Sequence, residues 1–379
     1  MMFDYETLRL IWWLLIAVLL LGYAIMDGFD LGVGTLLPFV GRSDDERRVL
    51  INAIGPTWDG NQVWLVLGLG AIFAAWPAVY AAAFSGMYAA MLLMLFALFL
   101  RPIGFDYRSK IASPAWRSFW DYALFFGGMV PAVVMGIAFG NLLQGVPFHF
   151  DENFRSFYTG SMAELLNPFA LLAGLVSLSM LVMHGATFLL IKTEGVLQYR
   201  ALKASRGAAV LTTVLFAVAG IWLMAGIEGF RLVGEVDHYA GSTPFGLNVV
   251  HETGAWMSNF RNYPWMWLAP LLGMGGALLV MVFGDRKPGM SWISSSVSVA
   301  GIAATAGLSM FPFVLPSSTH PSQSLLMWNA TSSEQTLWLM FLAAAIFIPL
   351  IMAYTSWVFR VLRGKVTVEQ IKEQQHTAY

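Results

Sequence analysis

Residues 27–34 read DGFDLGVG and place two carboxylates, Asp27 and Asp30, inside one of the most apolar segments of the chain. Residues 10–26 before them and residues 31–41 after them carry no charge. Side chains three residues apart share one face of a helix. An ionised side chain at membrane depth costs at least ~2.5–3.5 kcal/mol, so it points into protein or water and commonly marks an ion path. The stretch therefore predicts a membrane helix with a functional acid pair; the alternative is a polar pair that only fixes helix packing.

The composition sets the class of protein. Hydrophobic residues make up 58% of the 379 residues and charged residues only 11%, whereas soluble domains carry about 25% charged residues. The chain has no cysteine, which excludes disulfides, thiolate metal sites and cysteine nucleophiles. No phosphate-binding loop or nucleophile motif is present, and we expect no nucleic-acid partner. These features indicate an all-α polytopic, multi-pass membrane protein.

Nine apolar stretches are long enough to cross a bilayer. They cover approximately residues 8–38, 50–73, 79–100, 119–143, 165–191, 207–228, 264–284, 292–315 and 336–358. We expect a single integral membrane domain over residues 1–379, made of two four-helix bundles and one peripheral helix. The first bundle would cover about 8–143, the second about 165–315, and the ninth helix about 336–358.

Two further acids extend the first pair. The short hairpin at 41–48 makes the first two expected spans neighbours, so Asp27, Asp30 and Asp59 are predicted to form one cluster near mid-membrane. Asp106 follows the third span at the cytoplasmic boundary. The order Asp106, then the buried cluster, suggests a stepwise proton route from the cytoplasm. Arg101, at the inner end of the third span, is interpreted as an interfacial anchor that points toward lipid headgroups.

The histidines do not suggest a haem or metal site. Four fall in expected outer loops, one falls in the C-terminal tail, and only His184 lies within a span. A single buried histidine without an acidic neighbour on its helix face is expected to be a hydrogen-bonded core residue. The expected outer loops contain histidines next to acids, such as His251 and Glu252. Adjacent side chains point in different directions, so these residues are only a weak indication of a metal site.

Six stretches spread along the chain resemble subunit II of the bacterial cytochrome bd-type quinol oxidases. They are residues 27–34 (DGFDLGVG), 42–48 (RSDDERR), 58–64 (WDGNQVW), 73–86 (FAAWPAVYAAAFSG), 101–110 (RPIGFDYRSK) and 311–319 (FPFVLPSST). The resemblance implies a nine-helix, two-bundle subunit that pairs with subunit I, which carries haems b and d and the quinol site. It also implies a cytoplasmic proton route for the reduction of O2 to water, an oxygen route as a further option, small accessory single-span subunits, and room for a structural quinone.

The resemblance also assigns individual residues. It implies a proton path with Asp30, Asp59 and Asp106, alongside Asp27 of the same cluster, and with Tyr379 at the mouth of the path. Trp64 and Arg101 would lie near the oxygen path.

Two other functions compete with the oxidase subunit. A proton-coupled secondary transporter would also place carboxylates at mid-membrane, but it should show helices broken by Gly or Pro in both halves. The acids cluster only in the first half, which argues against a transporter. A structural scaffold would leave the buried acids unexplained. An absorption spectrum of the purified complex separates these functions, because only the oxidase shows reduced haem b and d bands.

The distribution of positive charge predicts the orientation. All but four of the 21 lysines and arginines fall in one set of alternate loops, the exceptions being Arg9, Arg155, Arg231 and Arg261. The positive-inside rule places the larger set in the cytoplasm. We therefore expect an external N-terminus and a cytoplasmic C-terminus. Reporter fusions at each end should show this arrangement, and an active periplasmic reporter at the C-terminus would overturn both the orientation and the number of spans.

Overall fold

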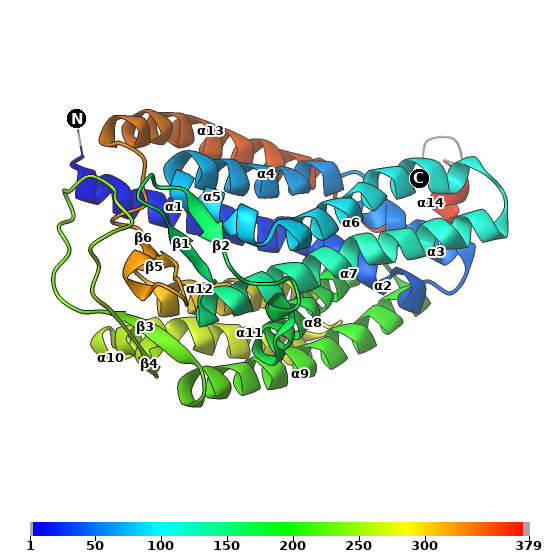
Figure 1. The fold of residues 1–379 in the computed structure, drawn as a ribbon. Helices are drawn as coiled ribbons and strands as arrows, with labels where there is room; N and C mark the ends of the chain where they lie inside the picture. The colour runs from blue at the N-terminus through cyan, green and yellow to red at the C-terminus, as the bar shows by residue number, and fades with distance from the viewer. Residues whose placement is uncertain (1–2, 374–379) are drawn as a thin grey trace.

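Long helices that run side by side form most of the molecule (Figure 1). The structure is a computed structural model that describes residues 3–373. Within these residues, eight helices are long and apolar enough to cross a membrane, and one sharply bent pair makes a ninth span if it is counted as one. The all-α polytopic fold expected from the sequence is thus confirmed.

The nine candidate spans share high hydropathy and are joined in sequence order. They are α1–α2 (Tyr5–Met26 and Gly28–Val40), α4–α5 (Trp58–Ala75 and Pro77–Gly86), α6 (Tyr88–Tyr107), α7 (Pro114–Gln144), α8 (Pro168–Lys192), α9 (Gly195–Ala225), α11 (Leu268–Phe283), α12 (Pro288–Met310) and α13 (Glu334–Val361).

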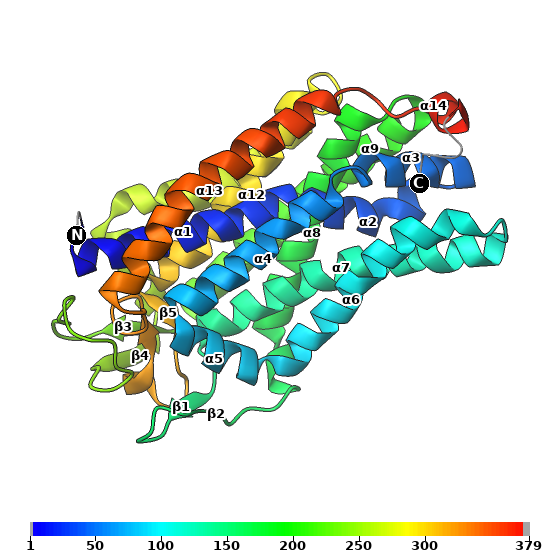
Figure 2. The ribbon, with the colours of Figure 1, turned by 90° about the horizontal axis from the view of Figure 1, so that it is seen from above.

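Short elements close the two ends of the bundle. Three antiparallel hairpins lie at the end where the chain begins (Figure 1), and α3 and α14 lie at the other end (Figure 2). The hairpins are β1 (Phe148–Phe150) with β2 (Ser156–Tyr158), β3 (Glu228–Leu232) with β4 (Val249–Thr253), and β5 (Phe313–Leu315) with β6 (Leu325–Leu326). The short helices are α3 (Asp44–Ile54), α10 (Ser258–Asn262) and α14 (Val368–Glu373), with 3-10 turns η1 (Arg108–Lys110), η2 (Glu164–Leu166), η3 (Ala255–Met257), η4 (Pro264–Trp267) and η5 (Pro321–Gln323).

The expected second span, residues 50–73, is not one continuous helix. Helix α3 ends at Ile54 and α4 begins at Trp58, and Pro56 lies between them. Proline lacks the N–H that a helix interior needs and restricts the residue before it. The expectation of one helix over residues 50–73 is therefore wrong, and Asp59 lies in the first turn of α4.

The expected third span, residues 79–100, is also divided. Its first part belongs to α5, which Pro77 begins and which is bent by 118° from α4. Helix α5 ends at Gly86, and the third spanning helix, α6, starts at Tyr88 after Met87.

Helix α8 is the centre of the packing and α13 is at its edge. In the 18-residue apolar stretch of α8, 72% of the residues are buried, whereas in that of α13 only 6% are buried. Helix α8 packs against α2, α7, α9 and α12, whereas α13 lies along α1 and α4 (Figure 2). Because α8 touches helices of both halves, it joins the part of the chain that carries the acids to the rest. The division into two four-helix bundles stays a prediction.

The contact between α2 and α8 depends on two glycines. A Cβ atom on Gly32 would lie 2.0 Å from the carbonyl oxygen of Leu181, and one on Gly185 would lie 2.5 Å from the backbone nitrogen of Val33. Both neighbours are backbone atoms, which cannot move aside as a side chain can. Glycine at these positions therefore lets α2, with its acid, lie directly against the central helix.

Substituting Gly32 by alanine should force α2 away from α8. We expect the Gly32→Ala variant to lose about 1–3 kcal/mol of stability, the usual cost of overpacking a close contact. Thermal unfolding of the purified complex measures the effect. Gly220→Ala in α9 is the matched control, because a Cβ there meets no atom within 4 Å. Equal melting temperatures for the two variants would show that the α2–α8 contact tolerates a side chain.

Candidate functional site

A buried ion pair lies at the break between α1 and α2. Asp27 ends α1 and precedes α2, and Arg101 of α6 donates to both of its carboxylate oxygens, at 2.9 and 2.7 Å. The side chains are 0% and 3% exposed. A guanidinium and a carboxylate joined by two parallel hydrogen bonds form one of the stronger polar contacts in proteins. The pair fixes α6 to the break and neutralises both charges.

The interpretation of Arg101 as an interfacial anchor is therefore wrong. Helix α7 covers Arg101, since a Cβ on Gly127 would lie only 3.0 Å from Arg101 Cγ. The acid at the break, 74 residues earlier in the chain, supplies the opposite charge that makes burial possible. Asp27 is thus an ion-pair partner and more than a packing residue.

Asp30, in the first turn of α2, is a buried acid without a cation of its own. It is 1% exposed, and one carboxylate oxygen accepts a hydrogen bond of 2.7 Å from the side-chain amide of Asn61 in α4. The other oxygen has no hydrogen-bond partner among the described residues. A buried polar atom without a partner is uncommon and calls for an explanation, such as a water molecule or a functional role. This oxygen is where a proton or a water molecule can bind.

The other two predicted acids do not join this cluster. Asp59 and Asp106 are both exposed, and Asn61, two residues after Asp59, is the residue that contacts Asp30. The prediction of one cluster of Asp27, Asp30 and Asp59 is wrong for Asp59. Tyr379, the expected mouth of the path, lies outside the described residues.

Aromatic side chains surround the ion pair and the acid. The Trp58 ring stacks on Phe105 with a centroid separation of 5.0 Å, and Arg101 Cζ lies 5.6 Å from the Trp58 ring. Trp64 is 7% exposed and packs against α1, where a Cβ on Gly22 would lie 2.4 Å from its ring. These rings keep the site apolar, which strengthens the polar contacts inside it. The structure does not test whether Trp64 or Arg101 lines an oxygen path.

His184 holds the same break from the opposite side. Its Nε2 lies 2.9 Å from the carbonyl oxygen of Ile25, and its Nδ1 lies 2.8 Å from the Ser295 hydroxyl. Because a carbonyl only accepts, Nε2 carries the hydrogen and Nδ1 is left as the acceptor. The expectation of a hydrogen-bonded core histidine is confirmed. Through it, α8 and α12 of the second half stabilise the last turn of α1.

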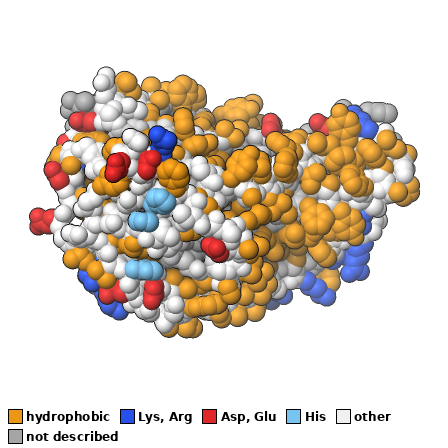
Figure 3. Space-filling view, in the orientation of Figure 1, with side chains coloured by type: hydrophobic (Ala, Val, Ile, Leu, Met, Phe, Trp, Pro, Cys, Tyr) orange, Lys and Arg blue, Asp and Glu red, His pale blue; other side chains and the backbone are white. Residues whose placement is uncertain are grey.

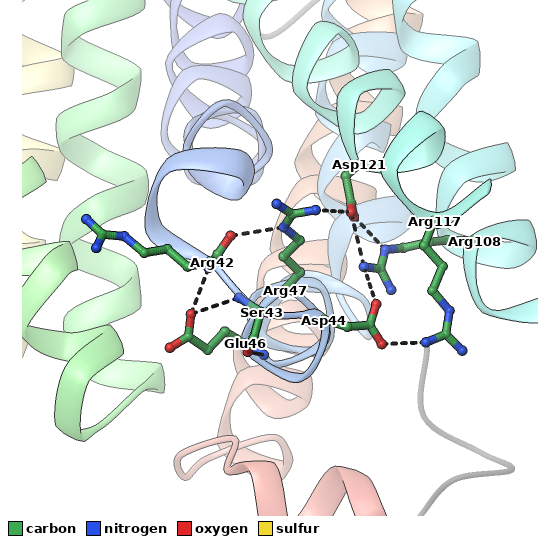
Figure 4. Close-up of polar contacts among 9 residues, drawn as sticks. Arg42, Ser43, Asp44, Glu46, Arg47, Arg108, Arg117 and Asp121 are labelled. Atoms are coloured by element: carbon green, nitrogen blue, oxygen red, sulfur yellow. Dashed lines mark hydrogen bonds and ion pairs between the residues drawn. The ribbon is translucent and has the colours of Figure 1, made fainter. Parts of the chain in front are cut away.

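A second network of charges lies at the end of the bundle that carries α3 (Figure 4). Asp121 of α7 is 1% exposed and accepts hydrogen bonds from Arg108 and Arg47, the latter at 2.8 Å. Asp44 of α3 accepts from Arg108 at 2.9 Å and from Arg117 at 2.6 Å. The network ties α3 to the ends of α6 and α7. The sequence reasoning missed it, although the charge-rich stretch at 42–48 was a visible signal.

Glu46 fastens the turn between α2 and α3. Its carboxylate accepts from the backbone N–H groups of Arg42 and Ser43, and the Ser43 hydroxyl accepts from the Glu46 N–H, which makes a capping box. Arg200 of α9 donates to the same carboxylate at 2.7 Å. Burial alone would raise the pKa of Glu46, but these hydrogen bonds and the Arg200 charge lower it overall. The turn therefore keeps its cap at neutral pH and docks on α9.

Breaking the buried pair from one side should be costly. We expect Arg101→Gln or Asp27→Asn alone to destabilise the complex by about 3–5 kcal/mol, because each leaves an uncompensated buried charge. The double variant Asp27→Asn/Arg101→Gln removes both charges and should regain most of the loss. Thermal unfolding of the four proteins measures the coupling. Additive losses in the double variant would mean that the two side chains act independently.

Comparisons with known proteins agree with the resemblance seen in the sequence. Residues 8–362 match the family model described as cytochrome bd terminal oxidase subunit II. The chain is 52% identical over 379 residues to cytochrome bd-I ubiquinol oxidase subunit 2 of Escherichia coli (strain K12), with 100% of both chains covered. It is 32% identical over 367 residues to cytochrome bd ubiquinol oxidase subunit 2 of Bacillus subtilis (strain 168), with 95% and 97% covered.

A solved structure shares the fold. A chain of the bd oxidase from Geobacillus thermodenitrificans superposes with a TM-score of 0.70 at 16% identity, with 94% of this chain and 98% of that chain covered. At that identity the likeness supports the fold alone. The family match over most of the chain and the full-length relatives establish the family: the chain belongs to the cytochrome bd terminal oxidase subunit II family.

Proposed function

We propose that this chain is the non-haem subunit of a bd-type quinol:oxygen oxidoreductase of the bacterial inner membrane. It pairs with subunit I, which carries haems b and d, and it supplies a cytoplasmic proton route for the reduction of O2 to water. The relatives that match over their full length are named as subunits of ubiquinol oxidases. The single observation that carries the proton route is Asp30, a buried acid with one free carboxylate oxygen.

Asp30 is suited to carry a proton because the local charges leave it unbalanced. Two acids, Asp27 and Asp30, share the region of the break with one buried cation, Arg101. Arg101 Nη1 and Nη2 each donate a hydrogen bond to Asp27. A buried carboxylate without a cation is costly, and binding a proton removes the charge. Asp30 can thus alternate between a protonated and an ionised form while the ion pair stays intact.

Asn61 orients Asp30 in either form. Its amide N–H bonds one carboxylate oxygen and leaves the other free for a proton or a water molecule. Asp59 lies two residues earlier on the exposed side of α4, and Asp106 is exposed near the end of α6. We propose the order Asp106, Asp59 and Asp30, with water molecules between the carboxyl groups.

The exposed face of α4 supports the pairing with subunit I. Asp59 shares this face with Val63 and Val66, which are 44% and 66% exposed. A carboxylate facing lipid costs at least ~2.5–3.5 kcal/mol, so another protein is the more favourable neighbour. Gly60 and Gly70 of α4 have open space around them, which permits the close helix approach that small residues allow in membranes.

His184, the histidine expected within a span, is not free to act as an axial haem ligand. His184 is buried, but both of its ring nitrogens are engaged in hydrogen bonds. This supports haem binding by the partner subunit. The oxygen route past Trp64 and Arg101, the accessory subunits and the structural quinone stay predictions of the resemblance.

A secondary transporter remains the weaker candidate. Broken spans occur at α1–α2 and α4–α5, as a transporter would need. Both breaks lie in the first half, and α8, α9 and α12 of the second half are continuous. The structure thus lacks, in the described part of the chain, the paired breaks that favour transport.

Replacing Asp30 with asparagine tests the proton route. Asn keeps the shape and a hydrogen bond but cannot carry the proton, so we expect turnover of the Asp30→Asn complex to fall at least ~10-fold, toward the range of lost acid–base groups. Haem content should be retained. Asp59→Asn should also slow turnover, by less if neighbouring waters substitute. Oxygen consumption at several pH values and the haem spectrum are the measurements.

Asp151→Asn is the matched control, because this acid lies in a turn between β1 and β2, has one long ion pair at 3.7 Å, and accepts backbone hydrogen bonds from Asn153 and Arg155 that an asparagine oxygen can keep. Full turnover with an unchanged pH profile in Asp30→Asn would remove Asp30 from the route. Loss of the haem bands would instead assign it a role in assembly.

A further inference from the structure

Tyr23 of α1 is a buried tyrosine whose hydroxyl group has no partner. The residue is 4% exposed, and in the described part of the chain its hydroxyl oxygen contacts no hydrogen-bonding group. Tyr23 belongs to an apolar cluster that includes Leu19, Leu31, Trp64, Leu65, Met94 and Leu98. A phenylalanine ring would fill the same space, and burying a polar group without a partner is costly. The hydroxyl group therefore indicates a bound water molecule or a functional role.

Tyr23 shares a helix face with both acids of the site. Backbone hydrogen bonds from Asp27 to Tyr23 and from Leu31 to Asp27 continue the helical geometry across the break between α1 and α2. Residues at positions i, i+4 and i+7 lie on one face of a helix, and Tyr23, Asp27 and Asp30 have this spacing. The helical rise places Tyr23 about 10 Å from Asp30 along the axis. The three side chains thus form a polar row, with the ion pair of Asp27 in the middle.

The two ends of this row carry oxygen atoms without partners. Arg101 interacts electrostatically with Asp27, Asp30 and Tyr23, but it donates its hydrogen bonds to Asp27. One carboxylate oxygen of Asp30 and the Tyr23 hydroxyl are left, both buried and unpartnered. Hydrophobic side chains cover most of the face of the molecule between its two ends (Figure 3). Bulk water therefore does not supply the missing partners, and internal water molecules are the natural ones.

We propose that the proton route continues from Asp30 past the ion pair to the Tyr23 hydroxyl, along water molecules held by this row. This inference rests on the proposed function. A hydroxyl group both donates and accepts a hydrogen bond. Tyr23 accepts a proton from the water molecule on the Asp30 side while it releases its own proton to a water molecule on the outer side. One O–H bond forms as another breaks, so the charge of Tyr23 and the ion pair do not change.

The Tyr23→Phe variant of the complete complex tests the inference, because it removes the hydroxyl group and keeps the ring. We expect turnover to fall at least ~3-fold, less than for a lost acid–base group because water molecules remain. Turnover should also slow more in D2O than that of the wild type, since proton transfer then limits the rate. The haem bands should be retained and the melting temperature should not fall. Tyr354→Phe is the matched control, because this tyrosine of the spanning helix α13 is 64% exposed and its loss should change none of these readouts.

The double variant Tyr23→Phe/Asp30→Asn separates this inference from the proposed function. If both residues carry the same protons, the double variant should be no slower than Asp30→Asn alone. Wild-type turnover and a wild-type effect of D2O in Tyr23→Phe, with Asp30→Asn slow, would overturn the inference and leave the proposed function in place. Losses that multiply in the double variant, or loss of the haem bands in Tyr23→Phe, would also overturn it. Full turnover of Asp30→Asn would overturn both.

Discussion

The buried ion pair between Arg101 and Asp27 is the contact on which the rest of the candidate site depends. It places a charge from α6 at the break between α1 and α2, where both partners are almost fully buried. Since each charge is tolerable only with the other, the pair fixes the relative position of three helices. His184 holds the same break from α8 by a hydrogen bond to Ile25. Between these two supports, Asp30 is presented to Asn61 with one oxygen free.

This arrangement separates two roles that the sequence assigned to a single acid cluster. Asp27 has a permanent partner and serves to hold the helices, whereas Asp30 has no cation and can exchange a proton. The two acids differ because the site has one buried arginine, Arg101, which pairs with Asp27 and leaves Asp30 without a cation. Acids outside it, Asp59 and Asp106, lie on the surface of this chain, where another subunit can complete their surroundings. In the proposed function, the buried site of this chain is the inner part of a proton route that other groups must extend.

The fold could be predicted largely from the sequence, because span length and hydropathy depend on local composition. The breaks at Pro56, inside the expected second span, and at Met87, inside the expected third span, were missed, although proline was a visible signal at the first. The site was harder to predict. Asp27 and Asp30 were correctly predicted as buried acids, whereas Asp59 is exposed, and the hydrogen-bond partners of the buried acids come from distant elements. Arg101 and Asp27 are 74 residues apart, and so are Arg47 and Asp121. Which helix faces meet depends on crossing angles and on close glycine contacts, such as that of Gly32 with Leu181. The periodicity of apolar residues in the sequence does not predict these.

In the proposed function, Asp30 binds and releases a proton while the ion pair between Asp27 and Arg101 stays in place. Infrared difference spectroscopy of the reduced and oxidised complex tests it most directly, since a protonated carboxyl group has a stretching band distinct from that of a carboxylate. We expect a carboxyl band that is lost in Asp30→Asn and kept in Asp151→Asn. A difference spectrum of Asp30→Asn with an unchanged carboxyl band would contradict it.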